Sequence, residues 1–285
     1  MNRPKITVIG SINMDLLTGI AKMPQQGETL FGTDFAMKPG GKGANQAVAA
    51  ARLGADVKFI GKVGDDALGR ELLSHLKQKE IDIKHIGSES AKSTGIANVL
   101  LYNQDNRIIV VSGANEAVTP DYVAEKKDAL LDSDIVIMQM EIPIETIIWC
   151  VEFCYDYNIR VILNPAPATE LPNEIWERCT FITPNEEEAR QLGLKQFTNK
   201  LITTLGPQGA RFQESVIPTY RANVVDTTGA GDTFNGALAY YITKGHETED
   251  AILRANAAAS LAIEKLGAQE GMPTRVQVDK RLAEM

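Results

Sequence analysis

The chain has 285 residues, a net charge of −8 at pH 7 and 44% hydrophobic residues. This length fits one large α/β domain with a sizeable core, and the composition excludes a chain dominated by disorder. The acidic balance argues against a general nucleic-acid or anionic-membrane binder and favours a small-molecule partner, although a local basic pocket could receive a phosphorylated ligand.

The cysteines and histidines form no recognisable metal or redox motif. Cys150, Cys154 and Cys179 lack C-x-x-C spacing, and an odd number of cysteines suits a reducing compartment. The three histidines lack the paired spacing of a zinc site. The apolar run Ile6 to Ile9 is too short for a signal peptide, and no later segment reaches membrane-spanning length. We therefore expect a cytoplasmic protein without a membrane partner.

The first predicted element is a buried strand, Lys5 to Gly10, that ends in a tight turn. Asn13 and Asp15 follow it. In open α/β sheets ligands bind at the carboxyl ends of the strands, so both residues are candidates to hold a polyhydroxylated ligand. Ordinary turn formation is the alternative. A dinucleotide-binding fingerprint is excluded, because Gly10 does not begin a G-x-G-x-x-G pattern.

A glycine-rich segment then starts a helix. Glu28 to Lys38 has strand propensity and leads into Pro39 to Ala47, where the helix begins. Gly41, Lys42 and Asn45 fall in its first turn, where backbone donors, an ammonium and an amide could converge on a hydroxylated ligand. A plain loop-to-helix junction is the alternative. The P-loop pattern is absent, because no Ser or Thr follows the Gly-Lys pair.

The next segments depart from a regular alternation of strands and helices. Val57 to Val63 is predicted to be a strand and Arg70 to Lys79 an amphipathic helix. Thr94 to Tyr102 and Arg107 to Ser112 alternate around a polar turn and predict a β-hairpin. With the segment near residues 28 to 38, this hairpin could form a small sheet that acts as a lid or a subunit contact. The alternative is that these segments are additions to the edge of the main sheet.

From Asp121 onward helices and strands alternate regularly, which predicts a parallel sheet covered on both faces. The expected elements are a helix to Leu131, a strand Asp134 to Met140, a helix Glu145 to Tyr157 and a strand Arg160 to Asn164. Glu141 directly follows one strand, so its carboxylate is expected to point at the ligand crevice. Asn185 and Glu188 have the spacing of a helix capping box, which is a structural interpretation of both residues.

The most informative stretch is Val225 to Phe234. Ala222 to Val225 favours a strand and Thr233 to Thr243 has helical spacing, which puts Gly229-Ala230-Gly231 at a helix N-terminus. Free N–H groups and the helix dipole stabilise a phosphate or a developing anion there. Asp232 then has two interpretations: it stabilises the helix N-terminus, or it is a general base beside phosphate-binding amides.

Together these motifs resemble the ribokinase-like, or phosphofructokinase-B, carbohydrate kinase family over essentially the whole chain. The segments that carry the resemblance are Gly10 to Asp15, Gly40 to Ala47, Met138 to Glu141, Asn164 to Pro167, Thr183 to Glu186, Thr204 to Gly206 and Asp226 to Asp232. The resemblance implies one kinase domain over residues 1–285. Its fold would be a three-layer α/β sandwich with a mostly parallel central sheet, and a small β-sheet lid from about residues 12–38 and 94–112. It also implies a homodimer paired through the lid sheet.

The implied reaction is transfer of the γ-phosphoryl group of ATP to O5 of D-ribose. Asp232 would be the catalytic base, and the amides of Gly229, Ala230 and Gly231 would form the anion hole. Mg²⁺ would bridge phosphate oxygens, and K⁺ would bind next to the anion hole. The alternatives are a related kinase for deoxyribose, a ketose or a nucleoside, and a sugar-binding regulator without turnover. Retention of Asp232 and of the glycine turn argues against the regulator.

The family's binding positions carry over to three groups of residues. The sugar site would comprise Asn13, Asp15, Gly41, Lys42, Gly43, Asn45, Glu141 and Asp232. The nucleotide site would comprise Asn185, Thr204, Leu205, Gly206, Gly209, Gly231 and Asn256. The monovalent cation would bind, largely through main-chain carbonyls, at Asp226, Thr228, Ala262, Lys265, Gly267 and Gly271. Glu188 ends an N-x-x-E motif that the family links to Mg²⁺. Gly271 stands where the family pattern has serine.

The segment of residues 189–203 is shorter than the family pattern, which fits a whole crossover helix there. Parallel strands need a crossover of a dozen or more residues. We therefore expect either an uncovered sheet face or a changed local strand order, with reduced stability or altered oligomerisation as the consequence.

Overall fold

Six parallel strands form the central sheet of the computed structural model, which describes residues 3–103 and 105–284. The strand order is β10-β9-β8-β1-β4-β5, and each neighbouring pair runs parallel. The strands are β1 (Lys5–Ile9), β4 (Asp56–Gly64), β5 (Ile86–Glu89), β8 (Ile135–Gln139), β9 (Arg160–Asn164) and β10 (Phe181–Ile182). The predicted mostly parallel sheet is confirmed.

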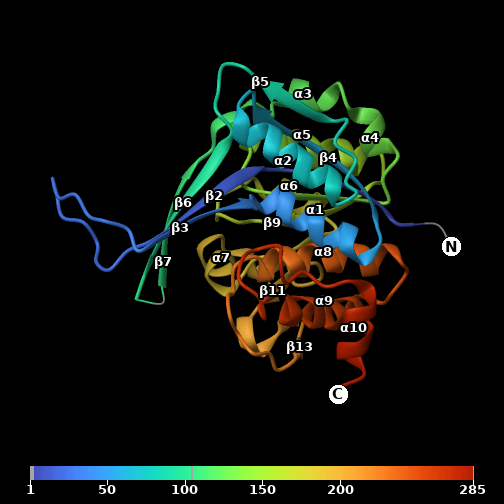
Figure 1. The fold of residues 1–285 in the computed structure, drawn as a ribbon. Helices are drawn as coiled ribbons and strands as arrows, with labels where there is room; N and C mark the ends of the chain where they lie inside the picture. The colour runs from blue at the N-terminus through green and yellow to red at the C-terminus, as the bar shows by residue number, and fades with distance from the viewer. Residues whose placement is uncertain (1–2, 104, 285) are drawn as a thin grey trace.

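Helices cover both faces of this sheet (Figure 1). Side chains of a strand alternate between the faces, so Ile6 and Val8 join one buried cluster and Ile9 joins the other. The first cluster includes residues of α1 (Lys42–Leu53), α2 (Ala67–Gln78), α8 (Ala230–Thr243), α9 (Thr248–Ala262) and α10 (Arg275–Leu282). The second includes residues of α3 (Pro120–Ala124), α4 (Lys127–Leu131), α5 (Ile144–Asp156) and α6 (Asn173–Arg178). The expected three-layer sandwich is therefore confirmed.

A second sheet stands apart from the central one, with strand order β3-β2-β6-β7 (Figure 1). Its strands are β2 (Asn13–Gly19), β3 (Asp34–Gly40), β6 (Gly95–Tyr102) and β7 (Asp105–Val111). The hairpin and the separate small sheet were both predicted, although residue 104 of the hairpin turn lies outside the described residues. We call these four strands the lid sheet.

The short segment before β11 (Ile202–Thr204) packs as α7 (Glu186–Gln191) followed by a 3-10 turn, Leu194–Phe197. Leu194, Phe197 and Leu201 are buried in the cluster that holds α5 and α6. Isolated parallel bridges join Ile182 to Leu201 and Asn185 to Thr204, so β11 runs beside the end of β10. It then forms a three-stranded sheet with β12 (Ala210–Phe212) and β13 (Ser215–Ile217). Among the described residues, neither expected consequence is seen: β11 is the parallel neighbour that follows β10, and the buried side chains of the short segment cover the sheet there.

Three predicted elements were wrong in detail. The segment Glu28 to Lys38 is a strand only from Asp34, where β3 begins. The helix expected from Asp121 to Leu131 is split into α3 and α4. Ala222 to Val225 is not a strand but an extended loop with exposed Val224 and Val225, because no neighbouring strand pairs with it. None of the described helices has both the length and the apolar character needed to cross a membrane.

Candidate active site

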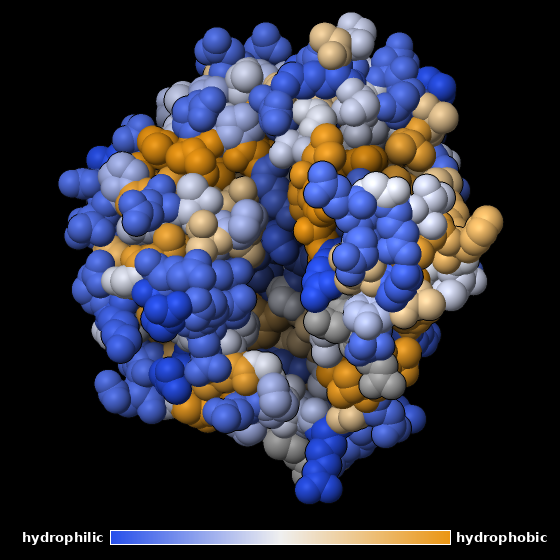
Figure 2. Space-filling view, turned by 90° about the vertical axis from the view of Figure 1, so that its left-hand side faces the viewer, coloured by the Kyte–Doolittle hydropathy of each residue, from blue (hydrophilic) through white to orange (hydrophobic). Residues whose placement is uncertain are grey.

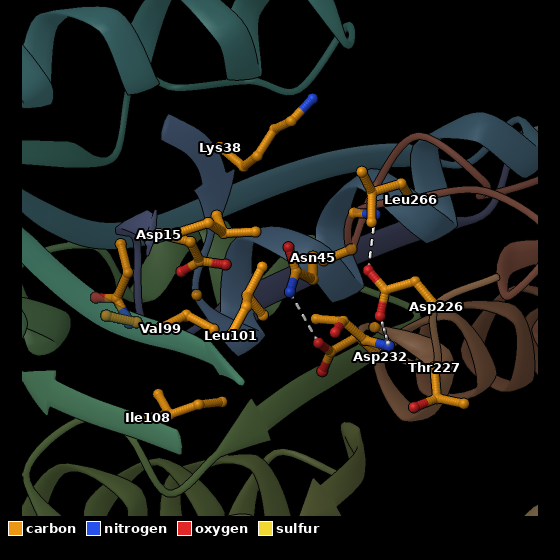
Figure 3. A pocket seen from close by; sticks show the side chains of 18 of the residues that line it. Asp15, Lys38, Asn45, Val99, Leu101, Ile108, Asp226, Thr227, Asp232 and Leu266 are labelled. Atoms are coloured by element: carbon orange, nitrogen blue, oxygen red, sulfur yellow. Dashed lines mark hydrogen bonds between the residues drawn. The ribbon is translucent and has the colours of Figure 1, made fainter. Parts of the chain in front are cut away.

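A cleft of about 850 Å³ opens between the lid sheet and the turns at the carboxyl ends of the central strands. Figure 2 shows it as a hollow with hydrophilic residues inside and hydrophobic residues on its walls. One wall is apolar and comes from the lid sheet, where Val99, Leu101 and Ile108 face the cleft (Figure 3). The opposite wall is polar and comes from the first turns of α1 and α8. A cleft of this size suits a small-molecule ligand.

Asp232 lies in the first turn of α8 at the polar wall, with only 8% of its surface exposed. Asn45 Nδ2 donates to its Oδ2 at 2.9 Å (Figure 3), and Gln46 Nε2 donates to its Oδ1 at 3.0 Å. Both donors belong to the first turns of α1, so the two helix N-termini meet at this carboxylate. Hydrogen bonds to both oxygens fix its orientation.

The donors to Asp232 are themselves held by buried amide side chains. Gln46 Oε1 accepts from Gln139 Nε2 at 2.7 Å, and Gln46 Nε2 also donates to Asn164 Oδ1 at 3.1 Å. Asn45 Oδ1 accepts from Gln269 Nε2 at 2.8 Å. The sequence analysis assigned no role to these supporting residues. Gln46 and Gln139 had a local signal, since both lie inside recognised motifs, whereas nothing near Gln269 in the chain points to the site.

Asp15 projects from β2 into the cleft (Figure 3). Burial, followed by the negative charges of Glu141 and Asp232, raises the pKa of its carboxyl group to about 7, although Lys42 opposes this shift. This carboxylate therefore titrates near neutral pH. Perturbed titration inside a cleft is typical of a functional position.

Asn13 and Glu141, both expected at the sugar site, line the same cleft and are fixed by neighbours. Asn115 Nδ2 donates to Asn13 Oδ1 at 2.7 Å, which leaves the Asn13 amide group available as a donor. Glu141 Oε2 accepts from Ser11 Oγ at 2.5 Å and from the Lys42 amide at 3.1 Å. Asn115 is a supporting residue that sequence reasoning missed, because it lies about a hundred positions from its partner.

Lys42 occupies a strongly negative part of the cleft. Burial lowers the pKa of its ammonium, but the charges of Asp232, Glu141, Glu188 and Asp15 outweigh burial and hold that pKa above its usual value. The side chain therefore stays charged. Gly41 and Gly43 are tightly packed beside it, since a Cβ on either would come within 2.7 Å of the β1–β2 turn backbone.

The glycine turn before α8 has the expected position but not three free amides. Gly229 has φ +77°, and a Cβ there would lie 2.4 Å from the Ala268 carbonyl oxygen, so glycine is required. The Ala230 amide donates to the Thr227 carbonyl at 3.2 Å. Among the described residues, the Gly229 and Gly231 amides have no such partner, and a Cβ on Gly231 would face open space. Two of the three expected amides are therefore available as donors.

The residues expected to bind a monovalent cation converge beside this turn. Asp226 Oδ1 accepts from the Thr228 amide and Oδ2 from the Gly267 amide, each at 2.9 Å. Burial opposes ionisation, but these hydrogen bonds lower the pKa of Asp226 below its usual value. A Cβ on Gly271 would lie 1.8 Å from the Ala262 carbonyl oxygen, so serine would require the backbone to shift there. No cluster of three His, Cys, Asp or Glu side chains suited to a metal occurs in residues 3–103 and 105–284.

The nucleotide-side residues lie outside this cleft and contact one another. The Asn185 and Thr204 backbones form a parallel bridge, and the Leu205 amide donates to the Gly209 carbonyl at 2.8 Å. Asn256 Nδ2 donates to the carbonyls of Ile217 and Pro218, so its amide group holds that loop. Gly206 is open, whereas Gly209 packs closely against the same loop.

Asn185 and Glu188 form the predicted capping box at the start of α7. Each side chain accepts a hydrogen bond from the other residue's amide at 2.8 Å. Burial raises the pKa of Glu188, while the Asn185 amide and Lys42 lower it. The structural interpretation of this motif is confirmed, and one Glu188 oxygen remains without a protein partner among the described residues.

Comparison with known proteins places this geometry in a family. The model of the pfkB family carbohydrate kinases matches residues 3–275. The chain is 46% identical to the ribokinase of Lactococcus lactis, covering 99% of this chain and 98% of that protein. It is 44% identical to the ribokinase of Bacillus subtilis over 98% of this chain and 99% of that one. The solved structure of Arabidopsis thaliana ribokinase complexed with ribose and ATP superposes with a TM-score of 0.91, at 31% identity and 99% coverage of both chains.

Proposed function

The chain belongs to the pfkB family of carbohydrate kinases, and we propose that it is an ATP-dependent kinase that phosphorylates O5 of D-ribose, giving ribose 5-phosphate and ADP. One observation carries the proposal. Asp232 lies where the polyol-binding side chains of β2 and α1 meet the glycine turn of α8. A base and an anion-stabilising turn are thus adjacent to a polar sugar pocket. The ribokinase relatives and the ribose-bound neighbour support ribose over other acceptors.

In the proposed reaction, Asp232 accepts the proton of the ribose O5 hydroxyl as O5 bonds to the γ-phosphorus. The bond between that phosphorus and the β–γ bridging oxygen breaks, and ADP leaves. A neutral alcohol is a poor nucleophile, so a positioned carboxylate assists the attack. Asn45 and Gln46 orient Asp232 toward the hydroxyl. The Gly231 amide and the charged Lys42 side chain would stabilise the negative charge on the phosphoryl group.

Asn13, Asp15 and Glu141 would position the ribose, with Gly41, Gly43 and Asn45. A donor amide and two carboxylates match a ring with several hydroxyl groups. The apolar side chains of the lid sheet would cover the other side of the sugar and exclude water from it. Nucleotide would bind along Asn185, Thr204 to Gly206, Gly209 and Asn256, next to the glycine turn.

The oxygen donors of the chain fit the implied cations. One carboxylate oxygen of Glu188 accepts from the Asn185 amide, and the carboxylate also interacts with the charge of Lys42. The other oxygen would hold Mg²⁺. Bound Mg²⁺ neutralises charge on the nucleotide phosphates. The ionised Asp226, with carbonyls of Thr228, Ala262, Lys265, Gly267 and Gly271, would hold K⁺, because main-chain carbonyls replace the water shell of that ion.

The test is ADP formation from Mg-ATP with D-ribose, 2-deoxyribose, fructose or adenosine, each with and without K⁺. We expect turnover that is selective for ribose and stimulated by K⁺. Selectivity for another acceptor would replace ribose in the proposal. Absence of turnover from folded protein that binds ribose would favour the non-catalytic regulator.

We further propose a single domain that works as a homodimer in the cytoplasm. Ile108 and Val110 line the cleft, so Ile109 and Val111 point away from it, and both are exposed. Phe35 and Met37 of the neighbouring strand β3 are exposed as well. An apolar patch of this kind supports pairing between lid sheets. The three buried free cysteines support a reducing compartment.

A further inference from the structure

A second hollow, of about 410 Å³, lies at the C-terminal ends of α1 and α8. Its lining includes the last turn of α1, the last turn of α8, the first turn of α10 and the chain segment before β1. In Figure 1 the N-terminal segment emerges on the side away from the lid sheet. Four cations line the hollow and no carboxylate does: Arg3, Arg52, Lys244 and Arg275. We call it the basic pocket, and it stands out in a chain of net charge −8.

Helix electrostatics accounts for only part of this charge. Arg52 in the last turn of α1 and Lys244 at the end of α8 are favourable at helix C-termini. Arg275 is the first residue of α10, where the helix dipole disfavours a cation. Its ion pair with Asp279 is 4.0 Å long and exposed, so it contributes little. Within residues 3–103 and 105–284, no carboxylate oxygen lies within 4.0 Å of the Lys244 ammonium.

A tyrosine hydroxyl is also available at this pocket. Tyr240 lines the basic pocket and, as a residue, is only 3% exposed. Its hydroxyl oxygen lies 4.0 Å from where a Cβ on Gly54 would be. This oxygen is not among the buried side-chain atoms that lack a partner, so it is accessible and can donate a hydrogen bond to a molecule in the pocket.

We propose that the basic pocket binds a phosphate dianion, either inorganic phosphate or the phosphoryl group of an organic phosphate. Arg3 and Arg52 already donate to backbone carbonyls, so they add mainly positive charge. The Arg275 guanidinium can bind phosphate oxygens in a fork, and Lys244 adds a point charge. The Tyr240 hydroxyl donates to a further oxygen. The ligand would join the C-terminal ends of α1 and α8, whose N-terminal ends hold Asn45 and Asp232.

Equilibrium dialysis with radiolabelled inorganic phosphate tests this site separately from catalysis. We compare the wild type with Lys244→Gln/Arg275→Gln and with a control, Lys77→Gln/Lys127→Gln, which removes two exposed cations from α2 and α4. We expect the pocket variant to bind phosphate at one site fewer, or at least about tenfold more weakly at that site, because charge-assisted hydrogen bonds are lost. The control should bind as the wild type does.

Competition by unlabelled ribose 5-phosphate and by AMP shows whether an organic phosphate is the better ligand. The melting temperature of each variant, measured without phosphate, shows whether it folds. If the double variant does not fold, Lys244→Gln alone replaces it. Equal phosphate binding by wild type and pocket variant would overturn the proposal. The assay needs no turnover, so failure of the proposed kinase activity would not affect it.

Discussion

Asp232 is bound by two side-chain donors, one on each carboxylate oxygen. Asp232→Asn keeps the size of the side chain but removes its basicity and turns one acceptor into a donor. We expect kcat to fall by about 10³-fold, because a positioned base contributes roughly 10²–10⁴-fold. Ribose affinity, measured by calorimetry, should change only a few-fold. Asp65→Asn, on the surface, is the control. Near-normal kcat in Asp232→Asn would remove the base role from this residue.

Asp15 gives the cleft a pH dependence that can be assigned to one group. Its raised pKa, about 7, means that ribose meets a protonated Asp15 in acid and a carboxylate in base. We expect KM for ribose to rise as pH falls below about 7, since the carboxylate is the better acceptor for sugar hydroxyls. A pH profile of KM from pH 5.5 to 8.5 measures this, and Asp15→Asn should lose the inflection near pH 7.

The same shift has a stability consequence with a defined sign. The pKa of Asp15 is higher in the folded state than in the unfolded state, so protonated Asp15 favours folding. This stabilisation is complete below the unfolded-state pKa and is lost as the pH rises toward the folded-state pKa of about 7. The charged Asp15 therefore destabilises the folded protein above pH 7. We expect Asp15→Asn to raise the free energy of unfolding at pH 8 by on the order of 2 kcal/mol, with little change near pH 4. Urea denaturation at both pH values is the measurement. An equal effect at both would contradict the burial explanation.

At the scale of elements, α7 carries a motif with both a structural and a functional interpretation. Glu188→Gln keeps an acceptor for the Asn185 amide but removes the charge, whereas Glu188→Ala loses both. We expect Glu188→Gln to melt close to the wild type and to need several-fold more Mg²⁺. Glu188→Ala should in addition lose about 1 kcal/mol of stability with the cap. Mg²⁺ titrations of activity and thermal melts separate the two roles. An unchanged Mg²⁺ requirement in Glu188→Gln would make the motif purely structural.

The elements with strong periodicity were predictable and those that depend on partners were not. The strand at Val57 to Val63, the hairpin of the lid sheet and α5 follow from local pattern alone. The loop at Ala222 to Val225 has strand-forming residues but no strand to pair with. The split between α3 and α4 and the entry of Asn13 into β2 likewise depend on tertiary packing. Local sequence does not encode such contacts.

The candidate active site also contains residues that local sequence marks and residues that only tertiary contacts bring into place. Asp232, Asn45 and Glu141 were identified because glycine motifs and strand ends mark them locally. Asn115 and Gln269, which hold Asn13 and Asn45, were not identified. Each meets its partner only after the chain has folded, over separations of about a hundred and more than two hundred residues. The packing of Gly271 against Ala262 was equally invisible in the sequence, although the unexpected glycine marked the position.

At the scale of the whole molecule, the short segment of residues 189–203 leads to a strand beside β10 without exposing the core there. Leu194, Phe197 and Leu201 are buried, so the segment supplies its own cover. The large exposed apolar surface lies elsewhere, on the lid sheet. Altered oligomerisation is therefore better tested at the lid than at the shortened segment.

Ile109 on β7 is 62% exposed and points away from the cleft. If lid sheets pair in a homodimer, Ile109→Glu buries a charge in an apolar interface, which is strongly unfavourable. We expect this variant to sediment as a monomer where the wild type sediments as a dimer. Its KM for ribose should rise, since the same strands line the sugar site through Ile108 and Val110. Val216→Glu is the matched control, because Val216 is 49% exposed on β13, outside the lid sheet. A wild type that sediments as a monomer at micromolar concentration, with unchanged KM in Ile109→Glu, would show that each lid closes its own cleft without a partner.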